Sequence, residues 1–286
     1  MSAPRSWSRR SPAEAAPWGV YALVALFTFV VLVPFYWMLK SALSRPEDVF
    51  TVPPQYLTTP TPENFGRLAE QVPIVRYFAN SVVFATATTL VTLAASFLAA
   101  YAIARFDVRG RNVLLLALVI STALPEIVTI IPLYQVLRDL RLLDSLVGLT
   151  FIMSSVLAPF TVWVLVAFIR QVPYEIEEAA IIDGARLPEI IWRIVLPMTA
   201  PALATMTVIN FVNAWNNLLY PLAFSSSLQA KTLSVAITEI FQARSPFGRP
   251  WELISSLGIT MMIPVVILAV VSQRAIVRGL TAGAFK

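Results

Sequence analysis

The sequence predicts an all-α integral membrane protein with six transmembrane helices. Of its 286 residues, 58% are hydrophobic and only 13% are charged, whereas a soluble domain is about half apolar and roughly a quarter charged. Nearly uncharged stretches that can cross a bilayer as a helix, which takes about 20 residues, recur six times. None of them shows the polar–apolar alternation of a transmembrane barrel strand.

The composition argues against several other functions. The sequence has no Cys and no His, which removes the usual ligands of zinc, iron–sulfur and haem sites and the commonest general base. We therefore expect no metal site, no cofactor and no catalytic residue in this chain. The net charge of +5 is the excess of 21 Lys and Arg residues over 16 acids, and the basic residues are scattered between apolar runs. That pattern is typical of membrane topology and not of nucleic-acid binding.

The expected spans, in order, cover residues 18–39, 77–104, 112–137, 145–169, 198–224 and 253–273. The first is longer than the apolar core of about 7–15 residues in a cleaved signal peptide. We therefore expect it to remain as a span behind a loose N-terminal tail, residues 1–17. The third span contains one acid, Glu126, between Pro125 and Pro132, and we expect the helix to be interrupted there. The transmembrane domain is expected to cover residues 18–276, followed by a C-terminal tail, residues 277–286.

The distribution of Lys and Arg predicts that both termini lie in the cytoplasm. With the N-terminus inside, the cytoplasmic segments hold 12 of these residues and the outside segments hold 9. The contrast is sharper by density, since the short cytoplasmic segment 105–111 alone holds three. Two long loops, 41–76 and 225–252, then lie outside, and loops of this length are usually functional or disordered.

The cytoplasmic loop at residues 170–197 has a helical pattern of its own and a net charge of −2. Pro173 suits the first turn of a helix, and the acids after it suit the positive end of the helix dipole. Gly184 allows the positive φ that ends a helix, and Pro197 ends or kinks a second short helix. Two interpretations remain open: docking into a cleft on a cytoplasmic partner, or lying on lipid, where Lys and Arg would be preferred. One face of the first helix is formed by Ile176, Ala179, Ala180 and Asp183.

This loop resembles the signature of the membrane subunits of bacterial ATP-binding-cassette (ABC) importers. The signature is Glu-Ala-Ala, three residues, Gly, nine residues, Ile, one residue and Leu-Pro. The chain matches every fixed position, at Glu178, Ala179, Ala180, Gly184, Ile194, Leu196 and Pro197. Residues 131–138, 213–222 and 273–284 are similar to segments of the carbohydrate-uptake branch, the maltose-type importers, and of its second, six-span permease. Arg141 departs from that pattern, which has Gly at this position.

The resemblance implies the type I importer permease fold in a bacterial inner membrane, with four kinds of contact. The expected partners are a second, different permease, two ATPase subunits that bind ATP and Mg, an extracytoplasmic sugar-binding protein, and membrane lipid. The chain itself has no Gly-x-x-x-x-Gly-Lys-Ser/Thr segment, so we expect no ATP site in it. Loop 225–252 is expected to contact the binding protein; the alternative is an ordinary solvated loop.

The resemblance also implies roles for the residues of the signature loop. In the family, the Glu-Ala-Ala helix inserts into a groove on the ATPase. Glu178 would then meet a basic residue there, and Gly184 would form the turn between the two helices. The residues expected to couple this chain to the ATPase are Glu178, Ala179, Ala180, Asp183, Gly184, Leu196 and Pro197.

A candidate sugar path lies in the fifth span, which is rich in amides and aromatic rings. Amides bind sugar hydroxyls and rings stack on apolar sugar faces. The expected path residues are Asn213, Asn216, Asn217 and Tyr220, which would share one helical face, together with Glu126 of the third span. The alternatives are interhelical hydrogen bonding for the amides and a place at the outer membrane interface for Glu126.

The expected cargo is a neutral di- or oligosaccharide. The same machine could import glycerol 3-phosphate or another polyol derivative, but an anionic cargo would favour Arg or Lys in the cavity. The six expected spans contain neither. A secondary transporter would show internal repeats and intramembrane acids for ion coupling, and the sequence offers one such acid and no repeat.

Overall fold

The computed structural model describes residues 18–242 and 248–284, the last eleven of these, 274–284, by their backbone alone. Every regular element in these residues is a helix, which confirms the all-α prediction. The predicted N-terminal tail, residues 1–17, and the centre of the second long loop, residues 243–247, are not among the described residues.

Four helices are long and apolar enough to cross a bilayer unbroken. They confirm the first, second, fourth and sixth expected spans; the first two helices are a few residues longer than predicted, and the fourth span begins one residue later. The last helix continues beyond its apolar part, so residues 277–284 of the expected tail are helical. The four helices are α1 (Trp18–Ala42), α4 (Ile74–Arg105), α7 (Leu146–Ile169) and α14 (Trp251–Ala284).

The third expected span is broken, as the sequence predicted. Helix α5 (Arg111–Ser121) and helix α6 (Glu126–Asp139) are bent by 103° relative to each other. Pro125 precedes α6 with φ −61° and ψ 132°, and an extended proline that lacks an N–H cannot continue a helix. Counting this bent pair and a second one that includes the fifth span, the described residues provide up to six spans.

The fifth span is not one helix, and this part of the prediction was wrong. Helix α11 (Ala200–Asn216) ends at the amide cluster, and α12 (Leu219–Phe224) begins after a break. Asn217 lies in the break with extended backbone, φ −65° and ψ 125°. The four predicted path residues therefore cannot share one continuous helical face.

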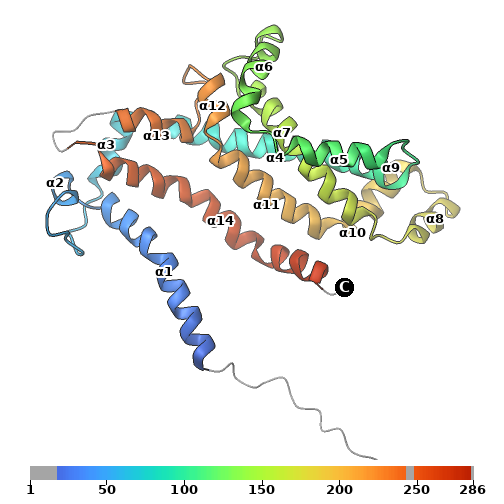
Figure 1. Cartoon of the computed structure of the whole chain (residues 1–286), viewed down its shortest axis with the longest axis horizontal. Helices are drawn as coiled ribbons and strands as arrows, with labels where there is room; N and C mark the ends of the chain where they lie inside the picture. The colour runs from blue at the N-terminus through green and yellow to red at the C-terminus, as the bar shows by residue number, and fades with distance from the viewer. Residues whose placement is uncertain (1–17, 243–247, 285–286) are drawn as a thin grey trace, which may run out of the picture.

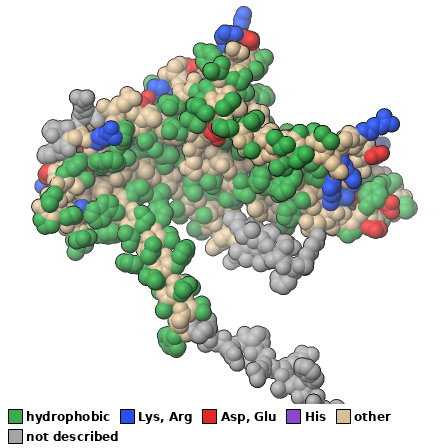
Figure 2. Space-filling view, viewed as in Figure 1, with side chains coloured by type: hydrophobic (Ala, Val, Ile, Leu, Met, Phe, Trp, Pro, Cys, Tyr) green, Lys and Arg blue, Asp and Glu red, His purple; other side chains and the backbone are tan. Residues whose placement is uncertain are grey.

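The core of the molecule is a bundle of α4, α7 and α11, which lie side by side in Figure 1. Helix α4 turns small polar residues toward this bundle at intervals of four, Thr88, Thr92 and Ser96, all fully buried. Small residues at this spacing allow helices in a membrane to approach closely. Helix α1 stands away from the bundle (Figures 1 and 2) and exposes apolar side chains on all sides, as suits contact with lipid or a partner helix.

Both long loops contain folded segments. Loop 41–76 contains α2 (Pro46–Val49) and α3 (Glu63–Gln71), and loop 225–252 contains α13 (Leu233–Gln242). The second loop is attached to the first turns of α4. The amide Nδ2 of Asn80 donates to the carbonyls of Leu228 and Lys231 at 3.0 and 2.8 Å, and the N–H of Leu233 donates to Ser81 Oγ at 2.7 Å.

The turn between α6 and α7 is fastened to the start of the same loop. One oxygen of Asp144 accepts the backbone N–H groups of Ser226 and Ser227 at 2.8 and 2.9 Å. Partial burial acts to raise the pKa of the Asp144 carboxyl, but these donors outweigh it and hold the pKa below its ordinary value. The stabilisation is therefore present at neutral pH and is lost as the pH falls through that lowered pKa.

Arg141, the departure from the expected Gly, lies in this turn with φ +56°. A left-handed backbone costs a residue with a Cβ about 1–2 kcal/mol, and glycine avoids that cost. We expect Arg141→Gly to raise the free energy of unfolding by up to about 1 kcal/mol, because the greater freedom of glycine in the unfolded chain offsets part of the gain.

The measurement is thermal unfolding of the purified protein in mild detergent. Arg138→Gly is the matched control, since Arg138 lies in the last turn of α6. A glycine in a helix is expected to lower stability by about 1 kcal/mol. A loss of stability in both variants would contradict the strain at Arg141.

Candidate functional site

The 170–197 loop forms two short helices joined by a glycine turn, as predicted. Helix α8 (Tyr174–Ile182) follows Pro173, and Gly184 takes φ +85°. The N–H of Gly184 donates to the carbonyl of Ile181 at 3.0 Å, and the N–H of Ala185 donates to that of Ala180 at 2.9 Å. This pair of bonds is the Schellman ending of a helix, which requires a left-handed residue at the position of Gly184.

The second helix of the loop leads directly into the bundle. Helix α9 (Leu187–Ile190) continues through a π-helical turn (Ile191–Val195) into α10 (Leu196–Met198), and the chain then bends by 76° into α11. Pro197 has no N–H for the helical ladder, which explains irregular winding just before it. Leu196 and Pro197 therefore shape the bend into α11 and do not belong to the surface of α8.

The surface of α8 is open. Glu178, Ala179, Asp183 and Gly184 are exposed, Ala180 is half-buried, and Ile182 at the tip is 86% exposed. Figure 2 shows acidic and hydrophobic side chains next to each other at this end of the molecule. A helix that presents both kinds to the outside suits a protein groove better than a lipid surface, which favours Lys and Arg.

Sequence reasoning missed the buried acid of this loop, Glu177, which is 1% exposed. Its carboxylate accepts Arg105 Nε at 2.7 Å and the hydroxyl of Tyr101 at 2.9 Å. Arg105 also donates from Nη2 to the carbonyl of Val172 at 2.9 Å. Removing one member of such a buried pair typically costs about 3–5 kcal/mol. The partners are 72 positions apart, and no local pattern relates positions that distant.

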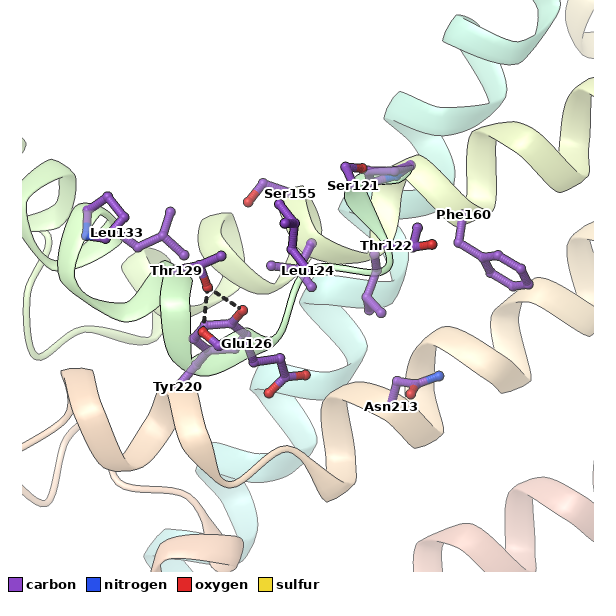
Figure 3. Close-up of a pocket in the computed structure, with 14 residues that line it drawn as sticks. Ser121, Thr122, Leu124, Glu126, Thr129, Leu133, Ser155, Phe160, Asn213 and Tyr220 are labelled. Atoms are coloured by element: carbon purple, nitrogen blue, oxygen red, sulfur yellow. Dashed lines mark hydrogen bonds between the residues drawn. The ribbon is translucent and has the colours of Figure 1, made fainter. Parts of the chain in front are cut away.

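A cavity of about 490 Å³ opens where the third and fifth spans are broken. Ligand pockets for small molecules occupy roughly 300–1,000 Å³. Figure 3 shows Glu126, Thr129 and Tyr220 together at the start of α6, with Asn213 on α11. The polar and aromatic lining residues are Ser121, Thr122, Glu126, Thr129, Ser155, Phe160, Asn213 and Tyr220. A second space of about 340 Å³ shares Glu126 and Asn213 and adds Asn216 and Asn217.

Hydrogen bonds join both breaks to each other. Nδ2 of Asn217 lies 3.3 and 3.4 Å from the two oxygens of Glu126, and the hydroxyls of Thr129 and Tyr220 are 3.0 Å apart. Asn217 Oδ1 accepts the backbone N–H of Tyr220 at 3.1 Å, and Ser234 Oγ donates to the Asn217 carbonyl at 2.8 Å. Asn217 is thus buried with its side chain engaged in structural bonds, whereas Asn213 and Asn216 are exposed.

The structure brings the five predicted path residues to one place, although by a different route from the predicted helical face. Asn213 and Asn216 lie on the last turn of α11, and Asn213 Nδ2 donates to the carbonyl of Ile209 at 2.8 Å. Asn217 lies in the break, Tyr220 lies on α12, and Glu126 faces them from α6. The lining residues from α7, Ser155 and Phe160, were not predicted, because nothing in the sequence of this uncharged span marks them out from its other residues.

The lining suits a ligand that offers hydroxyl groups and no negative charge. It combines amide, hydroxyl and carboxylate groups with two aromatic rings, and none of the lining residues in the described part of the chain is Lys or Arg. Amides and carboxylates bind hydroxyl hydrogens, whereas an anion would need a cationic partner.

Comparison with known proteins decides the family. The family model described as binding-protein-dependent transport system inner membrane component matches residues 91–282. Three of the similar proteins are permeases with 31–32% identity to this chain. The chain belongs to this family, as a permease of the carbohydrate-uptake ABC type. It is thus a multi-pass protein of the inner membrane and a transport component, not a catalyst.

These three relatives match this permease over almost its whole length. The diacetylchitobiose uptake system permease protein DasC of Streptomyces coelicolor is 31% identical over 94% of this chain and 96% of its own. The trehalose/maltose transport system permease protein MalG of Thermococcus litoralis is 32% identical over 91% and 94%. The sulfoquinovosyl glycerol transport system permease protein SmoH of Agrobacterium fabrum is 32% identical over 89% of each.

A solved structure shows the same fold. It is a bacterial ABC transporter involved in the import of the acidic polysaccharide alginate, and it superposes with a TM-score of 0.76 at 21% identity. The match covers 90% of this permease and 95% of the chain compared.

The bond between Asn217 and Glu126 can be tested by substitution. In Asn217→Asp, an oxygen still accepts the N–H of Tyr220, but a second carboxylate now faces Glu126, and two such groups cannot both stay ionised without cost. We expect the free energy of unfolding to fall by about 1–3 kcal/mol. In the double variant Asn217→Asp with Glu126→Gln, most of this loss should be recovered.

Thermal unfolding in detergent measures all three variants, Glu126→Gln alone being the control. Equal losses in the single and double Asn217→Asp variants would show that the two side chains do not interact.

Proposed function

We propose that this permease forms half of the translocation path of an ATP-driven, binding-protein-dependent importer for a neutral di- or oligosaccharide. The observation that supports the proposal is the cavity between the broken spans, which is lined by an amide, hydroxyls, a carboxylate and two aromatic rings, with no Lys or Arg among the described lining residues. Asn213 and Asn216 have exposed side chains for contact with the sugar, whereas Asn217, Tyr220 and Glu126 shape the wall. A second, different permease completes the path, and an extracytoplasmic binding protein delivers the sugar.

The names of two of the three relatives support this choice of cargo, whereas SmoH is named for sulfoquinovosyl glycerol, a sulfonated and therefore anionic compound. DasC is named for diacetylchitobiose and MalG for trehalose and maltose, which are neutral disaccharides. Glycerol 3-phosphate or another anionic polyol derivative fits less well, since the only charged side chain in the cavity lining is the acid Glu126.

The test of the cargo is competition for uptake in cells that express the complete transporter. We expect excess disaccharide to reduce uptake of a labelled neutral oligosaccharide at least tenfold. Glycerol 3-phosphate at the same concentration should leave uptake unchanged, because the cavity offers no cationic site for its phosphate group. Competition by glycerol 3-phosphate and not by disaccharides would reject the proposal in favour of the anionic cargo.

We further propose that α8 docks into a groove on one of the two partner ATPase subunits, so that ATP-driven closure of the ATPase pair moves the permease. Its exposed acids and apolar tip support a protein partner. Glu178 meets a basic residue of the ATPase, Ala179 and Ala180 provide the close packing surface, and Asp183 and Gly184 form the turn. The two termini and the α8 end face the cytoplasm, as the Lys and Arg distribution favours, and α13 faces outside.

The glycine turn gives a test of this coupling role. A Cβ at Gly184 would meet no atom within 4 Å, so the position resists other residues only through its φ of +85°. Valine tolerates this conformation poorly and asparagine tolerates it well. We expect Gly184→Val to assemble but to lose at least tenfold in sugar uptake, while Gly184→Asn keeps most of it.

Uptake and ATP hydrolysis are measured on complexes of equal subunit content. Normal uptake in Gly184→Val would remove the support for coupling through this turn.

A further inference from the structure

Both ends of α4 are hydrogen-bonded to segments that lie far apart in the sequence. At one end, Arg105 and Tyr101 hold Glu177 of α8. At the other end, Asn80 and Ser81 hold the segment before α13, and the hydroxyl of Tyr77 donates to Glu239 of α13 at 3.1 Å. The two segments flank opposite ends of the bundle in Figure 1.

We propose that the Arg105–Glu177 ion pair is the fixed joint through which α8 moves α4, and that α4 transmits this movement to residues 228–242 at its other end. The inference rests on the proposed role of α8 as the docking helix of the ATPase. Glu177 and Arg105 are positioning residues in this scheme: they touch neither sugar nor nucleotide, and they fix one helix to another.

The Arg105–Glu177 ion pair is the main contact of α8 with the rest of the molecule. The exposed surface of α8 leaves Glu177 as its one fully buried residue, with half-buried Ala180 packed against the core beside it. Arg105 makes three different contacts at the start of α8. It pairs with Glu177, donates to the carbonyl of Val172, and lies 5.7 Å from the ring of Tyr174. A planar guanidinium with several fixed donors holds orientation as well as distance.

Helix α4 is built to transmit movement without bending. It runs for 32 residues, about 48 Å at the helical rise of about 1.5 Å per residue. The other three unbroken spans in the described residues each contain a proline, at Pro34, Pro159 and Pro264, whereas α4 contains none. Sharp helix kinks arise mostly at proline, so α4 is the span best able to shift as one body.

The far joint is equally polar. Glu239 accepts both the Tyr77 hydroxyl and Lys231 Nζ, the latter at 2.7 Å. Asn80 is buried, and its Nδ2 donates to two carbonyls of the segment. Displacement of α4 along its axis must therefore carry residues 228–242 with it or break these bonds. In the proposed orientation this segment faces the binding protein. Helix α4 can therefore also transmit a movement in the other direction, from the bound binding protein to the ATPases.

The first experiment removes the charge of the joint without changing its shape. In the complete reconstituted transporter, we expect Glu177→Gln to raise the number of ATP molecules hydrolysed per sugar imported at least threefold, and to lower the stimulation of ATPase activity by the binding protein at least threefold. Asp107→Asn is the matched control, an exposed acid two residues after Arg105 and outside the docking helix, and should match the unsubstituted transporter. An unchanged ATP-to-sugar ratio in assembled Glu177→Gln would overturn the proposal.

The second experiment needs no disruptive change and so does not depend on the folding of Glu177→Gln. The chain has no cysteine, so single cysteines at exposed Ile181 of α8 and Leu98 of α4 can carry a pair of spin labels, with cysteine-free partner subunits. We expect one narrow distance distribution that stays the same with and without trapped nucleotide. A label pair at Leu98 and Gln229 should behave in the same way. A nucleotide-dependent change in either distance shows that the joint at that end is not fixed.

The proposed import of a neutral sugar and the proposed joint between α8 and α4 can each be rejected without the other. If the unsubstituted transporter does not import a neutral oligosaccharide, the proposed function is wrong, and the label distances still decide whether α8, α4 and residues 228–242 move together. If it imports the sugar but the label distances change with nucleotide, the joint is wrong while the function stands.

Discussion

A helix that breaks inside a bilayer frees backbone N–H and C=O groups that lipid cannot bind, and side chains must bind them instead. The arrangement of this permease around its cavity depends on that constraint. At the break of the fifth span, Asn217 Oδ1 accepts the N–H of Tyr220 and Ser234 Oγ binds the Asn217 carbonyl. At the end of α5, the hydroxyls of Ser121 and Thr122 bind the carbonyls of Leu118 and Val119.

The same constraint explains why the cavity lies where it does. Two broken spans that face each other leave a space between their ends, and the groups that satisfy the breaks also line it. The bond from Asn217 to Glu126 then ties one break to the other. An acid and an amide within a membrane protein are costly unless they are paired, and here each is the partner of the other.

The sequence was most informative where the physics is local. Apolar length located the spans, Pro125 located the break at Glu126, and Gly184 located the turn after α8, because each effect acts within a few residues. The four-residue spacing of amides in the fifth span failed as a guide, because Asn217 ends the helix that the spacing presumed. The role of Glu177 could not be predicted for another reason: it depends on Arg105, which tertiary packing alone brings near Glu177.

The loop with α8 reaches the rest of the molecule by two different routes. One is covalent: α9 and α10 continue across the bend at Pro197 into α11, whose far end carries Asn213 and Asn216 at the cavity. The other is the buried ion pair to α4, whose far end holds residues 228–242. The routes meet again at Ser234, which follows that attachment and binds the carbonyl of Asn217. A displacement of the loop that moved α11 and α4 by different amounts would strain this bond at the cavity wall. The break in the fifth span is therefore the point where relative movement of the two helices is expected to change the shape of the cavity, the proposed sugar path.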